Sequence, residues 1–132
     1  MLRIKWFIQV VSCFLLSSCA PLVFLGVGAV AGIAGYQYHE GALTVIYQAP
    51  FMETWQSSLQ ALDQMNIKVQ NSSHDTTSGK ISATQADGKK VTVSLEYRTA
   101  QETEAVIRVG HLGDKDRSLT IKEEIRRILV KD

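Results

Sequence analysis

The sequence predicts an α+β fold, a two-layer sandwich in which an antiparallel sheet of about five strands carries two helices on one face. Three features of the sequence lead to this prediction. Two segments repeat apolar residues at helical spacing, so each predicted helix has one apolar face to bury. Several shorter segments alternate apolar and polar residues, as half-buried strands do. Short turns separate these strands, and short turns join antiparallel neighbours. The predicted order is β-α-β-β-β-β-α, a helix-grip-like arrangement.

The first predicted strand runs through Leu43, Val45 and Tyr47, which are each separated by one residue. Pro50 follows, and proline is favoured in the first turn of a helix. A helix is then predicted, because apolar residues recur every three or four positions: Phe51, Trp55, Leu59 and Leu62. This helix is expected to end near Asn66, since asparagine tolerates the left-handed backbone of a helix C-terminus.

The next strands are predicted from alternation and from the number of residues in one turn, odd or even, which we call its parity. Ile67 and Val69 begin a short strand, residues 71–78 read as a polar loop, and Ile81 begins another strand. Ile81 shares a face with Val93 only if the turn between them holds three residues. We therefore expect a loop at Ala86-Asp87-Gly88, with Gln85 opposite Lys89, Ile81 opposite Val93 and glycine supplying a positive φ.

A second hairpin and a second helix complete the predicted domain. The alternation predicts that Tyr97 lies opposite Ala105 and Arg98 opposite Glu104, across a loop at residues 100–102. Asp114 is a good N-cap for the last helix. The apolar stripe of that helix consists of Leu119, Ile121, Ile125, Ile128 and Leu129. The sheet face away from both helices is expected to carry Ser82, Thr84, Thr92, Ser94, Glu96, Arg98 and Arg108. Such a face is either simply solvated or a docking surface.

The N-terminus has the features of an export signal. Arg3 and Lys5 precede an apolar stretch, Trp6–Leu16, that is too short to span a bilayer. Leu16-Ser17-Ser18-Cys19 then resembles the lipobox of bacterial lipoproteins, an aliphatic residue and two small residues before cysteine. The resemblance implies a signal peptide over residues 1–18, cleavage between Ser18 and Cys19, and lipidation of Cys19 with a diacylglycerol and a further acyl chain such as palmitate. Several acyl chains give stable attachment where one does not.

The lipobox resemblance also implies a location. Alanine rather than aspartate follows the cysteine, which favours the inner leaflet of the outer membrane, facing the periplasm. Two alternatives stay open. One is an uncleaved transmembrane helix over Trp6–Ile33, in which Gly28 and Gly32 have a small-xxx-small spacing. The other is an ordinary signal peptide in which Cys19 is incidental.

The chain is expected to divide into three parts. Residues 1–18 are the signal peptide, and residues 19–38 form an uncharged Gly/Ala-rich tether or membrane-proximal segment. Tyr36 and Tyr38 end this tether, where aromatic rings suit a membrane–water interface. Residues 39–132 form a single small domain.

Composition excludes some classes of function. Removing Arg3 and Lys5 lowers Lys plus Arg from 14 to 12 while Asp plus Glu stays at 13, so the mature net charge is about −1. A near-neutral chain of mixed charge has no basic patch for nucleic acid. Cys13 lies in the expected signal peptide and Cys19 is expected to carry lipid, so no disulfide is predicted.

No catalytic, cofactor or metal site is predicted. His39, His74 and His111 fall in three separate loops and are not spaced like metal ligands on one element. Glu123 and Glu124 are adjacent, so on a helix they point to different faces and do not form a carboxylate pair. We therefore expect a protein that is not an enzyme.

The whole chain resembles a family of small bacterial lipoproteins with a domain of unknown function and a Gly/Ala-rich tract after the lipobox. The segments that carry the resemblance are Leu16–Cys19, Gly26–Tyr38, Trp55–Leu62, Ser78–Ile81, Ala86–Val91 and Ile107–Gly110. The family implies architecture and location but no activity. His111 departs from the bulky apolar or aromatic residue expected there, which argues against a shared ligand role for it.

Three functional hypotheses follow. The leading one is a lipid-anchored, non-enzymatic module that binds an envelope protein or glycan through its sheet face or loops. The second is a small-molecule or lipid-binding module with a pocket near Trp55 and Tyr97. The third is a hydrolase that uses His74 or His111.

Overall fold

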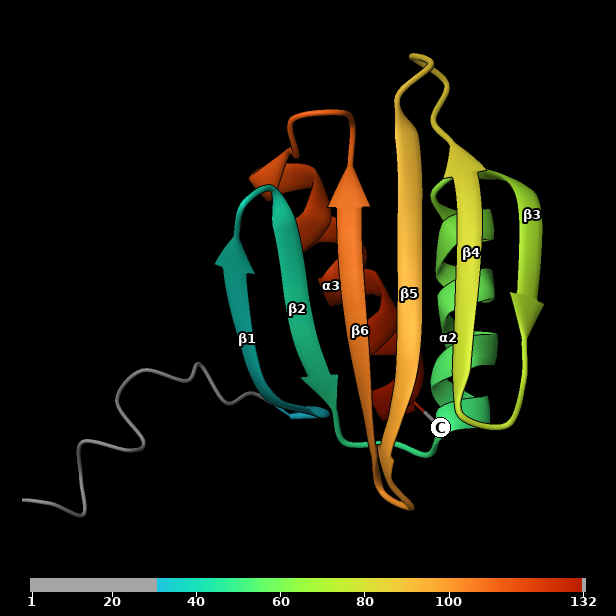
Figure 1. Ribbon diagram of the computed structural model, residues 1–132, viewed down its shortest axis with the longest axis vertical. Coiled ribbons are helices and arrows are strands. Elements are labelled where there is room, and N and C mark those ends of the chain that lie inside the picture. The colour runs from blue at the N-terminus through green and yellow to red at the C-terminus, as the bar shows by residue number, and fades with distance from the viewer. Residues whose placement is uncertain (1–30, 132) are drawn as a thin grey trace, which may run out of the picture.

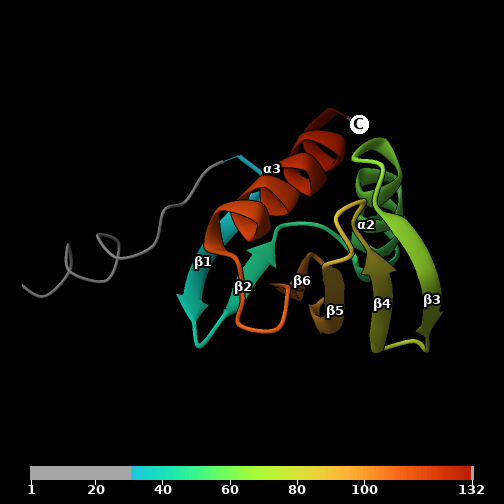
Figure 2. The same ribbon diagram turned by 90° about the horizontal axis from the view of Figure 1, so that it is seen from above.

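Six antiparallel strands form one sheet, and two helices pack on one of its faces (Figures 1 and 2). The computed structural model describes residues 31–131, so the expected signal peptide and Cys19 lie outside the described residues. The strands lie in the order β1-β2-β6-β5-β4-β3. Along the chain the elements are β1 (Ile33–His39), β2 (Ala42–Tyr47), α2 (Phe51–Gln64), β3 (Lys68–His74), β4 (Ser78–Thr84), β5 (Lys90–Thr99), β6 (Glu102–Val109) and α3 (Lys115–Lys131).

The predicted α+β class is confirmed, with one strand more than expected. The additional strand is β1, which lies inside the segment expected to be a tether, so the sheet begins at Ile33 and not after His39. A two-residue turn joins β1 to β2, and Glu40 and Gly41 in it have φ of +50° and +82°, as a type I′ hairpin turn requires.

The tyrosines of β1 pack on the helix side of the sheet. The Lys122 ammonium lies 3.9 Å from the centroid of the Tyr36 ring, and that of Lys115 lies 5.8 Å from the Tyr38 ring. Both lysines belong to α3, so the rings form cation–π contacts that join this edge strand to the helix. In the structure these rings belong to the domain rather than to a separate tether.

The predicted loop at residues 71–78 is wrong over most of its length. β3 extends to His74, and only a tight turn at residues 75–77 separates it from β4. Asp75 holds this turn, because its carboxylate accepts the backbone N–H groups of Thr77 and Ser78, each at 2.8 Å. These hydrogen bonds lower the pKa of the Asp75 carboxyl. β3 is polar because it is an edge strand exposed to solvent.

The predicted turn between β4 and β5 is confirmed. The backbone N–H of Gln85 donates to the Lys89 carbonyl at 2.9 Å, and Ile81 lies opposite Val93. Gly88 has a φ of +88°, the left-handed conformation that this three-residue loop requires.

The predicted register of β5 and β6 is wrong by two residues. Leu95, and not Tyr97, lies opposite Ala105, while Tyr97 lies opposite Thr103. A shift of two leaves every side chain on its expected face. Arg98 therefore still reaches Glu104, at 3.6 Å, although Glu96 is the residue opposite. Two features accompany the observed register. The strand β5 has a bulge after Tyr97, and the buried hydroxyl of Thr103 donates to the Ala49 carbonyl at 2.9 Å.

Both predicted helices are confirmed, with their ends. Asn66 has a φ of +58°, and α2 ends just before it. At the start of α3 the Arg117 backbone N–H donates to the Asp114 carboxylate at 3.1 Å, as expected for an N-cap.

The core lies between the helices and the sheet. Its fully buried larger side chains are Ile33, Leu43, Val45, Tyr47, Leu62, Ile81, Val91, Val93, Leu95, Ile107, Ile121 and Ile125.

Tyr47 links the sheet to α3 inside this core. Its hydroxyl donates to the Lys122 carbonyl at 3.0 Å, and burial raises the pKa of the phenol well above its ordinary value. The phenol therefore remains a hydrogen-bond donor at neutral pH.

Neither helix of the described chain is both long and apolar enough to cross a membrane. The alternative transmembrane segment, Trp6–Ile33, lies almost wholly outside the described residues, and its last residue belongs to β1.

Candidate functional site

The sheet has two distinct ends, which we call the base and the tip. The base holds the start of β1, the start of α2 and the β5–β6 turn, at the bottom of Figure 1. The tip holds the β1–β2 turn, the β4–β5 turn and the start of α3. The described chain begins at the base, where the carbonyl of Ala31 accepts a 3.4 Å hydrogen bond from Arg126 near the end of α3.

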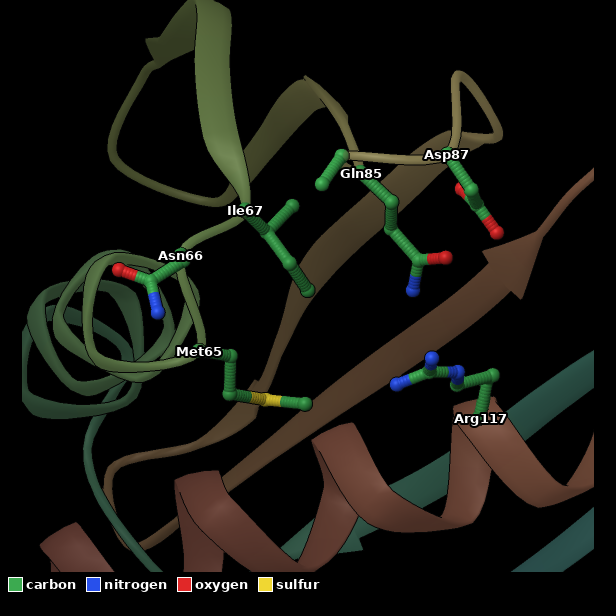
Figure 3. A pocket seen from close by; sticks show the side chains of 7 residues that line it. Met65, Asn66, Ile67, Gln85, Asp87 and Arg117 are labelled. Carbon is green, nitrogen blue, oxygen red and sulfur yellow. The ribbon is translucent and has the colours of Figure 1, made fainter.

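A recess opens at the tip, between the end of α2, the β4–β5 turn and the first turn of α3 (Figure 3). Its volume is about 330 Å³, within the range of small-molecule sites. It is lined by Met65, Asn66, Ile67, Gln85, Ala86, Asp87 and Arg117. We call it the Gln85 recess.

Gln85 is the unusual residue of this recess. Its side chain is 8% exposed and points into the space between Met65 and Arg117 (Figure 3). Among residues 31–131, neither its amide nitrogen nor its amide oxygen has a hydrogen-bond partner. An unpartnered buried amide costs about 1–3 kcal/mol of stability. The recess thus presents an unused donor and an unused acceptor side by side.

The backbone explains why Gln85 points inward. Ile81 and Ala83 face the helices, and side chains alternate along a strand, so the next residue on that face is Gln85. Both backbone groups of Gln85 are already bonded within the three-residue turn. Its N–H donates to the Lys89 carbonyl, and its carbonyl accepts the Gly88 N–H at 3.0 Å. The side-chain amide therefore remains as the free polar group.

Arg117 supplies positive charge to the Gln85 recess. Its guanidinium points across the recess toward Gln85 (Figure 3), and no carboxylate within residues 31–131 lies within 4 Å of it. The nearby Asp114 is engaged elsewhere. It accepts the Arg117 backbone N–H, which lowers the pKa of its carboxyl, and it lies 3.5 Å from the Lys89 ammonium.

The remaining walls are apolar, with one carboxylate at the side. Met65, Ile67 and Ala86 contribute carbon and sulfur surface. The Asp87 carboxylate accepts the backbone N–H of Lys89 at 3.0 Å. The recess combines a cation, an amide and an apolar wall, which is a composition that binds small polar ligands. It offers no nucleophile with an adjacent base.

In the sequence, Gln85 and Asp87 are notable only as residues of the predicted turn, and Arg117 is not notable at all. One signal was present for Gln85. The parity argument that placed Ile81 and Ala83 inward also places residue 85 inward, where a glutamine is out of pattern. No comparable signal marks Arg117, since an arginine in the first turn of a helix is ordinary on a surface.

Replacing Gln85 with methionine is expected to stabilise the fold. Methionine has a similar length and no polar atoms, so the variant removes the unpartnered amide and keeps the volume. The free energy of unfolding should rise by about 1 kcal/mol, measured by urea unfolding followed by circular dichroism. Gln101→Met, at an exposed position in the β5–β6 turn, should change it by less than about 0.5 kcal/mol. A clear loss of stability in Gln85→Met would mean that the amide is well paired in solution.

The three histidines are not brought together. His39 is exposed at the end of β1, His111 is exposed at the tip after β6, and His74 lies at the base, at the end of β3. The ring of His74 contacts the carbonyl of Asp75 at 2.9 Å rather than its carboxylate, and it packs 4.7 Å from the Trp55 ring. Within residues 31–131, no three His, Cys, Asp or Glu side chains are grouped to hold a metal ion.

The pocket expected near Trp55 and Tyr97 does not coincide with the Gln85 recess. Trp55 is 5% exposed in the core, whereas Tyr97 is 45% exposed. Neither residue lines the Gln85 recess. The adjacent Glu123 and Glu124 also act separately, each paired with an arginine of α3, Arg126 and Arg127 respectively. The pairing with Arg126 lowers the pKa of the Glu123 carboxyl.

The open face of the sheet has the polar composition predicted for it. Both helices lie on the opposite face (Figure 2). Thr92 lies between Ser82 and Arg108 in neighbouring strands. Glu96 and Glu104 lie directly opposite each other, a like-charge pair that destabilises this end of the sheet slightly and is offset by Arg98.

The chain matches a known protein family over most of its length. The model of a family described as "Protein of unknown function (DUF3568)" matches residues 3–128. No curated protein matches the chain. The family match thus spans nearly all of the chain, including the residues of the Gln85 recess.

Proposed function

Because the chain belongs to DUF3568, a family of proteins of unknown function, we propose a role for it from its own residues. It is a lipid-anchored protein of the bacterial envelope whose domain binds another envelope component without chemically changing it. The observation that carries this proposal is the Gln85 recess, which holds an unpaired amide and an unpaired guanidinium but no catalytic pair.

The anchor is proposed from Leu16-Ser17-Ser18-Cys19, with cleavage after Ser18 and lipid on Cys19. Ala20 favours the inner leaflet of the outer membrane, so the domain would face the periplasm. The segment from Cys19 to Ile33 reaches at most about 50 Å when fully extended, which keeps the domain near the membrane.

The positions of the anchor and of the recess suit this role. The described chain begins at the base, beside Arg126 and the half-exposed Val130 of α3, whereas the Gln85 recess lies at the tip. A domain held through its base would direct the recess away from the membrane.

The anchor is tested by intact-mass spectrometry of the protein isolated from membranes, beside a Cys19→Ala variant. The expected mature protein starts at Cys19 and carries a diacylglycerol and an acyl chain, and the variant carries neither. A full-length chain that still begins at Met1 would instead support the transmembrane alternative, and cleavage at another position without lipid would support an ordinary signal peptide.

Binding is tested by photo-crosslinking in living cells. A photoreactive residue at Ala86, which is exposed beside the recess, should give a discrete adduct, whereas one at Gln101 at the base should not. The adduct should disappear in Arg117→Gln, which leaves the core untouched. Equal adducts at Ala86 and Gln101, or an Ala86 adduct that persists in Arg117→Gln, would move the binding surface away from the tip and favour the open sheet face.

A further inference from the structure

We infer that the Gln85 recess recognises the free carboxyl end of a peptide or of an N-acylated amino acid. This inference rests on the proposed binding function and names the chemistry of its ligand. It follows from three adjacent features of the recess, namely the guanidinium of Arg117, the amide of Gln85 and the apolar wall beside Met65.

The guanidinium of Arg117 selects for a carboxylate. Its planar fork of N–H donors matches the two oxygens of a carboxylate, and within residues 31–131 no protein carboxylate occupies it. Asp87 also lines the recess and carries a negative charge. That charge disfavours a ligand with two negative charges, so a carboxylate fits better than a phosphate monoester.

The amide of Gln85 selects for a neighbouring peptide group. A side-chain amide presents one carbonyl acceptor and N–H donors, and a peptide group presents the complementary N–H and C=O. Both polar atoms of Gln85 are buried and unpaired, and the side chain points toward Arg117 (Figure 3). A ligand that places a peptide group next to its carboxylate would satisfy both residues, whereas a simple carboxylate such as acetate would satisfy one.

The apolar wall leaves room for one small side chain. Met65, Ile67 and Ala86 line the recess, whose volume of about 330 Å³ suits one or two small residues rather than a longer peptide. The methionine adapts its shape to different side chains, so we expect recognition of the carboxyl end more than of a particular residue.

The methionines give a direct readout of binding in the mature protein, isolated with its proposed anchor and held in detergent micelles. With ¹³C-labelled methionine methyl groups, Met65 reports on the recess and the exposed Met52, at the base end of α2, is an internal control. The probes are N-acetyl-alanyl-alanine, the same dipeptide with a carboxamide end, sodium acetate and inorganic phosphate. Assignment comes from Met65→Leu.

The dipeptide with a free carboxyl group should shift the Met65 signal saturably and leave Met52 unchanged. The carboxamide form and acetate should each bind at least tenfold more weakly, and phosphate should not compete. Arg117→Gln and Gln85→Met should each weaken binding at least tenfold while both proteins stay folded, and Arg127→Gln, on the same helix away from the recess, should bind as the unaltered protein does.

Other results would overturn the inference. Equal binding of the carboxamide form would show that the charge is not read, and equal competition by phosphate would show a general anion site. No shift of Met65 with any probe would exclude this ligand class. If cells still gave an Arg117-dependent adduct at Ala86, such a failure would reject the carboxyl-end chemistry and leave the proposed binding function standing.

Discussion

Replacing Gly113 with alanine is expected to destabilise the protein by about 2–5 kcal/mol, because two separate penalties act at this position. Gly113 has a φ of +85°, and a side chain in this region costs about 1–2 kcal/mol. An added Cβ would also lie 2.7 Å from the carbonyl carbon of Gly41 and closer still to its Cα and oxygen. All three are backbone atoms, which cannot move aside easily. The resulting overpacking adds about 1–3 kcal/mol to the loss of stability.

Gly88→Ala is the matched control for this variant. Gly88 has a φ of +88°, but a Cβ there would meet nothing within 4 Å. It therefore carries the conformational penalty alone, about 1–2 kcal/mol. Urea unfolding followed by circular dichroism gives both values. If Gly113→Ala cost no more than Gly88→Ala, the β1–β2 turn would not be packed against the loop before α3 in solution.

Replacing Trp55 with alanine is expected to cost about 3–5 kcal/mol, since it removes a large buried ring from the base of the core. The Trp55 ring stacks with Phe51 at a centroid distance of 6.5 Å and packs against His74 on β3. Gly79 makes room for it on β4, where an added Cβ would lie 2.6 Å from the indole. The indole thus joins α2 to β3 and β4, and its loss leaves a cavity between them.

Met52→Ala provides the control on the same helix, because Met52 is 45% exposed and should change stability by less than about 0.5 kcal/mol. Unfolding must be followed by circular dichroism, since the tryptophans are only Trp6 and Trp55 and the variant loses the fluorophore of the domain. A loss below about 1.5 kcal/mol would show that the surrounding residues collapse into the space.

The parts of the fold that were predictable from sequence are those with one buried face. Alternation in β4 and β5, together with the parity of the turn between them, correctly predicted that Ile81 lies opposite Val93. The stripes of both helices were equally clear, because a helix must bury its apolar face whatever the sheet order. Alternation also assigned β5 and β6 to the correct faces, but it does not distinguish registers that differ by two residues, and the β5–β6 register was therefore missed.

The edges of the sheet escaped prediction for a physical reason. β3 is almost wholly exposed, so no alternation continues beyond Val69, and residues 71–74 looked like a loop. The prediction for β1 was wrong for a different reason. It follows an uncharged Gly/Ala tract, and Tyr36 and Tyr38 were interpreted as membrane-interface residues when their partners are lysines of α3. Those partners are distant in the chain, and no local pattern indicates them.

The candidate site was less predictable than the fold. Gln85 becomes notable only when its burial and its lack of partners are known together, and both depend on α2 and α3 closing over it. Arg117 is one of many charged residues until the turn at Asp87 is placed beside it. The alternation of β4 places Gln85 on the buried face and could be read from the sequence. The absence of a partner for its amide depends on the surrounding tertiary structure and could not.

The place of β1 in the sheet has a mechanical consequence. The chain reaches β1 at the base, whereas the Gln85 recess lies at the tip, so a load applied between them would run parallel to the strands. β1 is held to β2 along its whole length, and the Gln48 N–H closes the base of the pair on the Gly32 carbonyl at 2.9 Å. Under such a load these hydrogen bonds would be sheared together rather than peeled one after another. The domain should therefore withstand a pull between its base and its tip better than a pull that separates β1 from β2 one hydrogen bond at a time.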